Sequence, residues 1–599
     1  MEDVLAAGLS EPVRGLITVD GPVSVSRSLA LEDAEVHFLS SQACLTLEGG
    51  ALFRAINCKF VHQDSLGPTL VTVSDATADF RDCQFLGAEG GTEEQLGRAL
   101  VLREQADVRL SKCKFDNNDQ HLELGQDSSA SLRACGFSRA RADAIRLRGA
   151  SRIVMVGTEV QESGWTGLVM GGSSSADLRL CRISGNGCHA VSLSDSARVQ
   201  SRGNGLTGNG QHGAYLAGKS SWDSLEDQFA SNHLCGLDIS ELSRCSLIES
   251  EAFGNESHGV QLRGGAEATL RACRLGDNMG SGLALFDEAQ ALATTLLAES
   301  NRLNGVQCGG NGRLLLRSSE VLENQSSGLA GFGESRLVVE STSLLGSAGY
   351  GAQVSGSSSL VLSQGLLEGN RKGGLLLADD SRAHAGDSIF RRNGLHGAAV
   401  ADAANATFSD NELSENARDG ALLLGSGTTL AVRNRFSSNG RHGLFAGPGA
   451  HTVLEKNQAR DNSGEDILVE GSAPQIKRSV EQLPSLEETP GVTLTAESGA
   501  TLSLPFQPKP IEESMLMALL RHGRLSEMAL GKAAKSRRVG GAMENLIDRL
   551  NKAGMPVLKH EGDGPEGNVY ALKLDLTRTR QPVGGRNIEN AQAQGREIC

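Results

Sequence analysis

Short runs of alternating apolar and polar residues recur along most of the chain, separated by turns rich in Gly, Ser and Asn. The segment 351–373 is typical. Ala352 and Val354 alternate with polar residues, as do Leu360 and Leu362, and a third apolar run follows after another turn. Alternation with a period of two predicts half-buried β-strands. We therefore expect each such segment to contain about three short strands and three turns.

The segment repeats every 23 residues, without insertion or deletion, between His121 and Asp466. One position of the repeat is Gly in 12 of 16 units, and the position four residues earlier is Asn in 13 of 16. The inward apolar positions recur in the same phase. Repeats of this length indicate stacked supersecondary units, in which a residue lies above its equivalent 23 positions away. Identical coils then form parallel sheets, and such crossovers are right-handed.

The repeated Asn and Gly predict how neighbouring coils are joined. An Asn in a tight turn can adopt left-handed backbone angles, and its amide can hydrogen-bond to the Asn of the next coil. The Gly is needed where the backbone has a positive φ or approaches its neighbour closely. The predicted Asn ladder consists of Asn186, Asn209, Asn232, Asn255, Asn278, Asn301, Asn324, Asn370, Asn393, Asn416, Asn439 and Asn462.

This pattern resembles the right-handed parallel β-helix family, which includes pectate lyases, periplasmic sugar-processing proteins and the β-helix of some F-box adaptors. The resemblance implies a mainly β fold over residues 1–504, a single-stranded right-handed parallel β-helix of about 20 coils. About four looser coils would precede His121, with an acidic Gly-rich insertion at 87–97. The resemblance is specific for the fold and unspecific for activity.

A different kind of sequence follows. Residues 505–511 have the composition of a linker. Residues 512–577 are predicted to form three helices and a hairpin, and resemble a winged-helix domain. The polar tail 578–599 is predicted to be disordered. The predicted elements are helices at Glu512–Arg521, Leu525–Lys535 and Val539–Ala553, with a hairpin formed by Pro556–Lys559 and Val569–Leu572.

The winged-helix resemblance implies a recognition helix with basic neighbours that can contact phosphate and grooves. Glu544 and Asp548 lie one helical step away and would repel phosphate. Since winged helices also dock to proteins, nucleic acid and a second protein both stay open as partners. The candidate binding residues are Lys532, Lys535, Arg537, Arg538, Asn545, Arg549, Lys552, Lys559 and His560.

Charge and hydropathy argue against nucleic-acid binding along the repeats, membrane insertion and secretion. The net charge is −15. The last 99 residues contain 15 Lys and Arg against 11 Asp and Glu, so the preceding 500 carry all of the negative excess. An acidic body argues against nucleic acid along the repeats. No apolar run reaches the length of a membrane span, and the sequence that begins Met1-Glu2-Asp3 lacks the pattern of a secretory signal. We therefore expect a cytoplasmic protein without a membrane partner.

Candidate catalytic residues are few. Asp379 and Asp380 precede His396, and paired carboxylates near a His resemble the apparatus of polygalacturonase-like β-helix enzymes. The first Asp motif and the Arg-Ile-Lys motif of that family are missing, and His recurs before the repeated Gly in four other units. No calcium-binding carboxylate cluster, zinc motif or phosphate loop is found. We predict no catalytic residue, cofactor or metal, and keep Asp379, Asp380 and His396 as the weaker alternative.

Four cysteines have similar contexts on apparently successive coils, namely Cys58, Cys83, Cys113 and Cys135. Neighbouring thiols could form a disulfide or share a soft metal. We favour a stack of buried thiols that only packs, and a role beyond packing stays open.

These observations favour a non-enzymatic cytoplasmic interaction scaffold. Its β-helix would bind a protein partner, and its C-terminal domain would dock to nucleic acid or a second protein within a multi-component complex. One alternative is a carbohydrate-active β-helix enzyme, a lyase or hydrolase, although carbohydrate is not the expected partner. A second alternative is a DNA-binding regulator that senses a ligand.

Overall fold

The computed structural model describes residues 11–63, 69–90 and 96–470, together with five strands between 492 and 572. Contacts within the chain separate residues up to Ile476 from a second unit, Lys477–Ile598. Each unit is described by itself. Among the described residues, no helix is long and apolar enough to cross a membrane.

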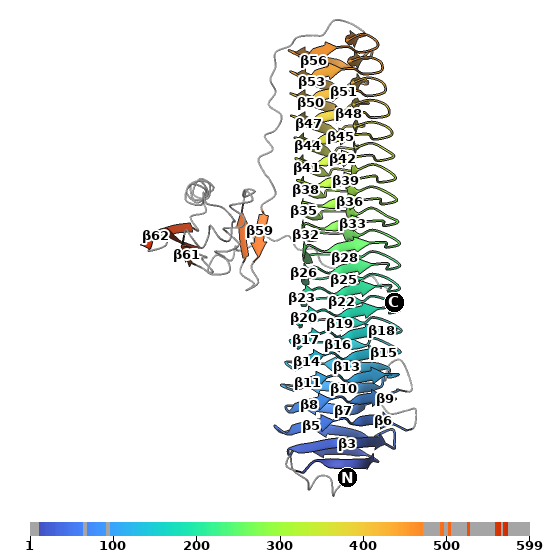
Figure 1. Ribbon diagram of the computed structural model, residues 1–599, viewed down its shortest axis with the longest axis vertical. Coiled ribbons are helices and arrows are strands. Elements are labelled where there is room, and N and C mark those ends of the chain that lie inside the picture. Colours follow the sequence, from blue (N-terminus) through green and yellow to red (C-terminus); the bar gives the residue numbers. More distant parts are fainter. Residues whose placement is uncertain are drawn as a thin grey trace, which may run out of the picture. The chain divides into compact units, whose positions relative to one another are not determined.

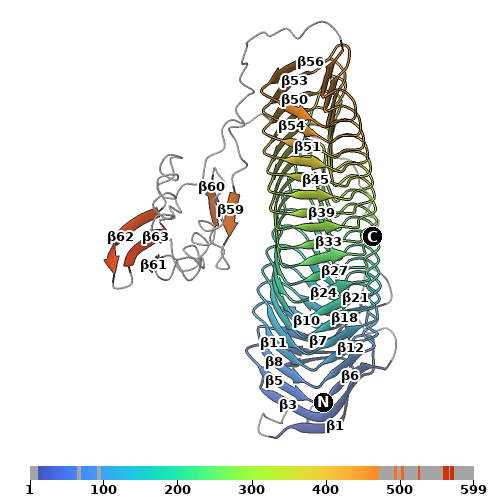
Figure 2. The same ribbon diagram turned by 45° about the horizontal axis from the view of Figure 1, so that its top comes forward.

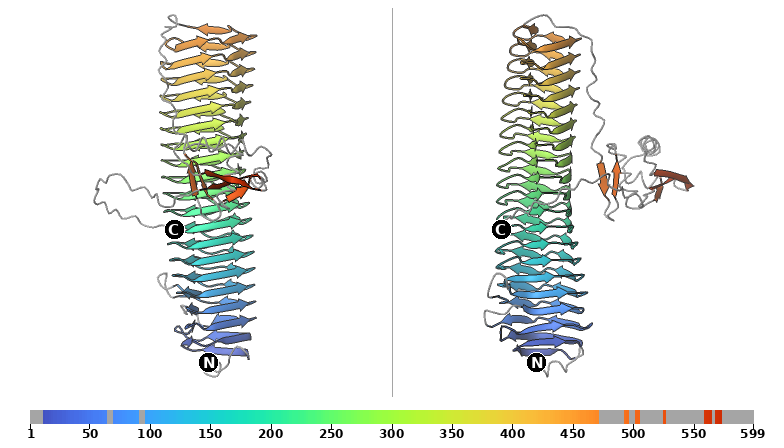
Figure 3. Two further views of the ribbon diagram at one scale, coloured as in Figure 1. Left: turned by 90° about the vertical axis from the view of Figure 1, so that its left-hand side faces the viewer. Right: turned by 180° about the vertical axis from the view of Figure 1, so that it is seen from behind.

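The first unit is a stack of parallel coils, each built from three strands (Figure 1). In a typical coil these are β43 (Ala352–Val354), β44 (Ser359–Ser363) and β45 (Leu366–Glu368). Each strand pairs in parallel with its equivalents in the coils before and after it. The stacked strands thus form three ladders, which we call the first, second and third ladder in chain order (Figure 3). The predicted parallel β-helix with three strands per coil is confirmed.

The loops between these strands are called the first, second and third turn of each coil. In the typical coil the first turn is 355–358, the second is 364–365 and the third is 369–374. Over the described residues the first ladder has twenty strands, from β2 (Pro22–Val25) to β58 (Ile467–Val469).

The coils at the N-terminal end show how the second and third ladders are related (Figure 2). A single ten-residue strand, β3 (Leu29–Phe38), pairs with both β5 (Leu52–Ile56) and β6 (Lys59–His62) of the next coil. Between these two strands Asn57 has a φ of 51°, which bends the chain. The second and third ladders therefore belong to one 38-stranded sheet in the described part of the chain.

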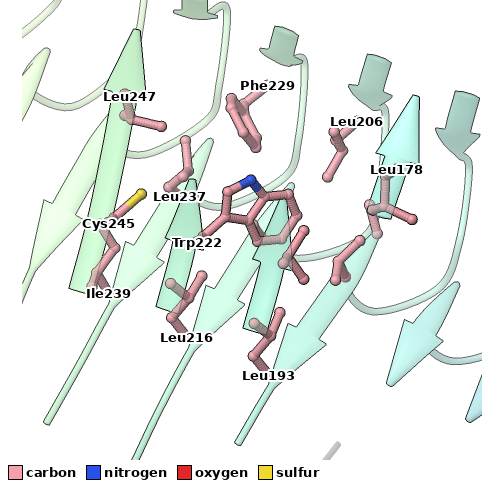
Figure 4. Packing of buried hydrophobic residues seen from close by; sticks show 14 of the residues in the cluster. Leu178, Leu193, Leu206, Leu216, Trp222, Phe229, Leu237, Ile239, Cys245 and Leu247 are labelled. Atoms are coloured by element: carbon pink, nitrogen blue, oxygen red, sulfur yellow. The ribbon is translucent and has the colours of Figure 1, made fainter. Parts of the chain in front are cut away.

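The interior of the coils is filled by equivalent side chains that stack on one another. In the third ladder the rings of Phe60, Phe85, Phe115 and Phe137 form a column with centroid separations of 4.4 to 4.9 Å. Further along, the fully buried indole of Trp222 lies among aliphatic side chains of neighbouring coils (Figure 4). A parallel stack with a constant register brings like residues together, as the repeat predicts.

The structure corrects two details of the repeat. Phe115 pairs with Phe137, so one coil has 22 residues. Counting back from Asn186 in steps of 23 predicts Asn117 at the Asn position, but Asn118 is the residue that hydrogen-bonds to the preceding coil there. The left-handed backbone angle belongs to the residue before the Asn, for example Gly254 with a φ of 64°. The repeated Gly is required for close approach instead: a Cβ on Gly259 would lie 2.7 Å from the carbonyl oxygen of Gly282.

The second unit contains antiparallel strands. β59 (Val492–Thr495) pairs with β60 (Thr501–Leu504), so these residues form a hairpin rather than a further coil up to residue 504. β61 (Arg524–Ser526), β63 (Gly567–Leu572) and β62 (Leu558–Gly564) form a three-stranded sheet in that order. The predicted hairpin is confirmed. The sequence predicted the start of a helix where β61 lies, and the rest of the three predicted helices lies outside the described residues.

Candidate functional site

The predicted Asn ladder is present and joins the third turns of successive coils. Each Asn Nδ2 donates to the Oδ1 of the Asn in the next coil at 2.9 to 3.1 Å, from Asn186 to Asn324 and again from Asn370 to Asn462. Ser347 separates the two runs. In most coils the same Nδ2 also donates to a backbone carbonyl of the preceding coil, as Asn255 does to Phe229 at 3.0 Å. One amide therefore connects three coils.

A second row of polar side chains, absent from the sequence-based prediction, lies directly before the repeated Gly in the third turn. Here the side chain of one coil accepts the backbone N–H of the equivalent residue in the next coil. His258 Nδ1 accepts from Ser281 at 2.9 Å, and Asn304 Oδ1 accepts from Ser327 at 3.0 Å. We call this the third-turn row. It explains why His recurs before the Gly: His189, His212, His258, His396 and His442 all lie in it.

A third row follows the bend between the second and third ladders. It contains a short Asn ladder, Asn411–Asn434–Asn457, and the fully buried carboxylate of Asp227. Asp227 accepts hydrogen bonds from Ser201, from Ser224 at 2.6 Å, and from the backbone and side-chain nitrogens of Asn204. Burial raises the pKa of Asp227, and these hydrogen bonds oppose that effect. An Asn five residues before the ladder Asn was a sequence signal for this row.

The same row holds the four cysteines of the N-terminal coils. Cys58, Cys83, Cys113 and Cys135 lie on successive coils, as predicted, and their thiols are free and buried. Cys83 Sγ donates to the carbonyl oxygens of Ala55 and Arg81 at 3.4 and 3.2 Å. The described residues contain no group of three or more His, Cys, Asp or Glu that could hold a metal.

The weaker catalytic alternative is not assembled as one site. Asp379 lies in the first turn, where its Oδ2 accepts the backbone N–H of Gly356 at 2.9 Å, and Asp380 beside it is exposed. His396 lies in a third turn, and its ring contacts Asp419 instead. Asp379 follows the C-terminal end of its first-ladder strand, β46 (Leu375–Leu377), whereas His396 precedes the N-terminal end of the next one, β49 (Ala398–Val400), so the two residues are at opposite edges of the first ladder. Of the basic candidates in the second unit, only Lys559 and His560, on β62, are among the described residues.

Two clusters of ionisable and aromatic residues lie on the outer side of the first ladder. In the first cluster the buried carboxylate of Asp238 receives two hydrogen bonds from Arg263, at 2.6 and 3.2 Å. His212 Nε2 is 3.6 Å from the same carboxylate, and its other ring nitrogen accepts the N–H of Cys235. His189, His212 and Tyr215 stack with ring centroids 5.3 to 6.1 Å apart. The Asp238 carboxylate and both ring nitrogens of His212 thus each face a group of the protein.

The second cluster is formed by His396, Asp419, Arg441, His442 and Phe445. Asp419 Oδ1 accepts the N–H of His442 at 3.0 Å, and its Oδ2 lies 3.1 Å from His396 Nδ1. Burial alone would raise the pKa of Asp419, but the neighbouring His396 ring, the backbone N–H of His442 and the Arg441 guanidinium hold it below its usual value. The guanidinium of Arg441 lies over the ring of Phe445, 5.2 Å from its centroid.

The buried histidines predict acid sensitivity of the first unit. Burial lowers the pKa of His121 to about 3 and that of His189 to about 4, and it lowers the pKa of His212 and His258 as well. Because these values lie below the unfolded value near 6.5, the neutral rings stabilise the fold above that pH. We expect the free energy of unfolding to fall as the pH decreases from about 6.5 towards 4. Urea unfolding at pH 7.5, 6.0 and 4.5 measures this.

The matched variant for that experiment is His189→Gln, whose amide oxygen can still accept the N–H of the next coil. It should unfold with a smaller pH dependence than the parent chain. An unchanged pH dependence in this variant would contradict a contribution from His189.

With this geometry in view, the family can be assigned. The model of the right-handed β-helix region matches residues 69–229, 225–367 and 366–481, which together cover most of the chain. The chain belongs to the right-handed β-helix family. The handedness predicted from the repeat is therefore correct. A comparison with curated proteins finds no significant match.

Several solved structures resemble the right-handed β-helix described here. The periplasmic alginate epimerase AlgG is 11% identical, with a TM-score of 0.31 over 60% of this chain and 81% of its own. The pectate lyase Pel9A is 11% identical, with a TM-score of 0.29 over 42% and 68%. A chain of the Vag8–C1 inhibitor complex is 12% identical, with a TM-score of 0.33 over 77% and 98%. Such similarities concern the fold alone and carry no information on the function of this chain.

Proposed function

We propose that the chain is a non-enzymatic cytoplasmic binding scaffold. Its β-helix presents a rigid outer surface to a protein partner, and its second unit docks to nucleic acid or to another protein. The observation that supports this most is the way the polar groups are used. Side chains that resembled catalytic residues serve as hydrogen-bond acceptors between coils, and Asp379 and His396 lie in different turns.

A scaffold also needs a surface that keeps its shape. The Asn ladder, the third-turn row and the Asp227 row each connect successive coils along the described β-helix. A repeat protein stabilised by contacts between neighbours presents an extended surface of this kind. The second unit contains the hairpin β62–β63 with β61 beside it.

Photo-crosslinking on each ladder tests the scaffold function. Benzoylphenylalanine is placed in separate variants at Val338 on the second ladder, Leu345 on the third and Leu422 on the first, all of which are half-buried outward positions. We expect one or more positions to form an adduct with one protein, and that protein to form a stoichiometric complex with the purified chain. The control variant carries the crosslinker at the buried Leu367, where no adduct is expected.

One outcome would contradict the scaffold proposal. If no position forms an adduct, and the purified chain turns over a polysaccharide with a rate abolished by His396→Ala, the β-helix is an enzyme and the scaffold proposal is wrong.

A further inference from the structure

The outward-facing residues of the first ladder change from polar or small to apolar near its C-terminal end. Between Ser192 and Gln353 the outward position of each strand is polar or small, except for Tyr215. From β46 onward it is apolar in every coil. The first four of these residues are Leu376, Ala399, Leu422 and Phe445, carried by β46, β49 (Ala398–Val400), β52 (Ala421–Leu423) and β55 (Leu444–Ala446), and Leu468 of β58 follows in the same register. Leu376 and Leu422 are half-buried, whereas Ala399 and Phe445 are buried. We call the first four residues the apolar stripe.

Positive charge appears beside the apolar stripe. The position two residues before the repeated Gly is uncharged in ten successive coils, from Ala142 to Gly349. In the next four coils it reads Lys372, Leu395, Arg418 and Arg441. All three cations are exposed. With coils about 4.8 Å apart, they extend over about 14 Å. We call them the cation row.

Two of these cations are held in place by aromatic rings. Lys372 Nζ lies 5.6 Å from the ring centroid of Tyr350, and Arg441 lies over Phe445. No ion pair of Lys372 or Arg418 is found within the described ranges. In a chain with a net charge of −15, a localised row of exposed cations indicates an anionic partner.

Between the stripe and the cation row lies the pair His396 and Asp419. Asp419 is fully buried, and its Oδ2 has no hydrogen-bond partner among the described residues when His396 Nδ1 accepts the N–H of Asp419 at 3.3 Å. An unsatisfied buried carboxylate oxygen is costly. The His396 ring, 3.1 Å from Oδ2, and the guanidinium of Arg441, 3.8 Å from it, are the groups that lie nearest to this charge.

Because Nδ1 accepts the N–H of Asp419, Nε2 of the neutral His396 ring carries the proton, and 11% of the side chain is exposed. His212 differs, because its Nδ1 accepts a backbone N–H while its Nε2 faces Asp238. His396 Nε2 can therefore donate a hydrogen bond to a bound molecule, whereas both ring nitrogens of His212 are directed at groups within the protein.

We propose that the apolar stripe, the cation row and His396 together bind an acidic, amphipathic peptide segment of a protein partner. Apolar side chains of the segment lie on Leu376 and Leu422. Its carboxylates pair with Lys372, Arg418 and Arg441. A carbonyl oxygen of the segment accepts a hydrogen bond from His396 Nε2. This inference rests on the proposed scaffold function and identifies where the scaffold binds and what chemistry it recognises.

The combination of groups favours a peptide over other polyanions. An extended peptide advances about 3.4 Å per residue and alternates its side chains, so about five residues cover the cation row. Their alternate side chains can reach the apolar stripe and the cations separately. Neither a polysaccharide nor a nucleic acid backbone offers aliphatic side chains for a stripe of Leu and Phe.

The test uses a fluorescein-labelled peptide in which Glu alternates with Leu and Phe and one position is Ser, together with a peptide in which every Glu is Gln. Binding to the full chain is measured by fluorescence anisotropy. The variant Lys372→Glu/Arg418→Glu/Arg441→Glu reverses the cation row. The matched control Arg313→Glu/Arg336→Glu/Arg382→Glu reverses three Arg on the second ladder, on a different side of the coil.

We expect the Glu peptide to bind, the Gln peptide to bind at least tenfold more weakly, and the cation-row variant to lose at least tenfold in affinity while the control keeps it. Absence of binding, or equal losses in both triple variants, would overturn the proposal. So would tighter binding of a polyuronate or an oligonucleotide than of the peptide. If crosslinks form only at Val338 or Leu345, this surface is wrong and the scaffold function stands.

Discussion

The substitution Asn255→Ala is expected to lower the free energy of unfolding of the β-helix by about 4 kcal/mol. Asn255 Nδ2 donates to Asn278 Oδ1 at 2.9 Å and to the Phe229 carbonyl, and its Oδ1 accepts from the backbone and side chain of Asn232. Removing the amide deletes all four of these hydrogen bonds at a site with no solvent exposure and leaves the backbone N–H of Asn232 without its ladder acceptor. Unsatisfied buried groups are the reason for the large effect.

Urea unfolding followed by circular dichroism measures this change, and hydrogen exchange locates it. Because each coil contacts only its neighbours, increased exchange should centre on the coils from Phe229 to Asn301. The control is Asn311→Ala, at an exposed first-turn position, which should change the stability by less than about 0.5 kcal/mol. Equal effects of the two variants would contradict the ladder as the source of stability.

The second large effect is expected for Trp222→Ala, at about 4 kcal/mol. Trp222 is fully buried, packs edge to face with Phe229 at a centroid distance of 6.0 Å, and donates from Nε1 to Ser201 Oγ at 2.6 Å (Figure 4). Truncation leaves a cavity and disturbs the hydrogen bond of Ser201 to the buried Asp227.

The chain contains one other tryptophan, Trp165, which is half-buried in a third turn. Trp165→Ala should cost about 1 kcal/mol or less. Thermal and urea unfolding of both variants compare the two sites. A cost for Trp165→Ala as large as that for Trp222→Ala would contradict the packing described for the interior.

The arrangement of the coils could be predicted from the sequence because the repeat is strict. Once Asn278 lies 23 residues after Asn255, stacking follows from the period alone, and the predicted ladder residues are all found in the ladder. The register before His121 could not be predicted in the same way, since one coil has 22 residues and Asn118 replaces Asn117. Counting by a fixed period cannot detect this one-residue deletion, because Asn117 and Asn118 are both Asn and either fits the pattern.

The role of the polar rows was harder to predict. His396 and Asp379 are close in sequence and resemble catalytic residues, but the coil places them in different turns, and each accepts a backbone N–H across coils. That use depends on side-chain direction, which a repeat period does not define. The apolar stripe and the cation row are visible in the sequence only after the outward positions of β46 to β55 are known.

The second unit shows where prediction of secondary structure from local sequence succeeds and where it fails. The glycine-rich turn between Lys559 and Val569 was sufficient to predict the hairpin, because turn residues flanked by apolar runs are a strong local signal. The segment after Arg524 has helical spacing, yet residues 524–526 pair with β63 as a strand. Pairing with a distant segment overrides a short local preference for helix.

The central claim is that the β-helix binds a partner through one defined surface at its C-terminal coils. Hydrogen exchange of the full chain, with and without the acidic peptide, tests it most directly. We predict protection in β46, β49, β52 and β55 and in the third turns that carry Lys372, Arg418 and Arg441. Protection confined to the outer strands of the second ladder, or spread evenly over all coils, would contradict it.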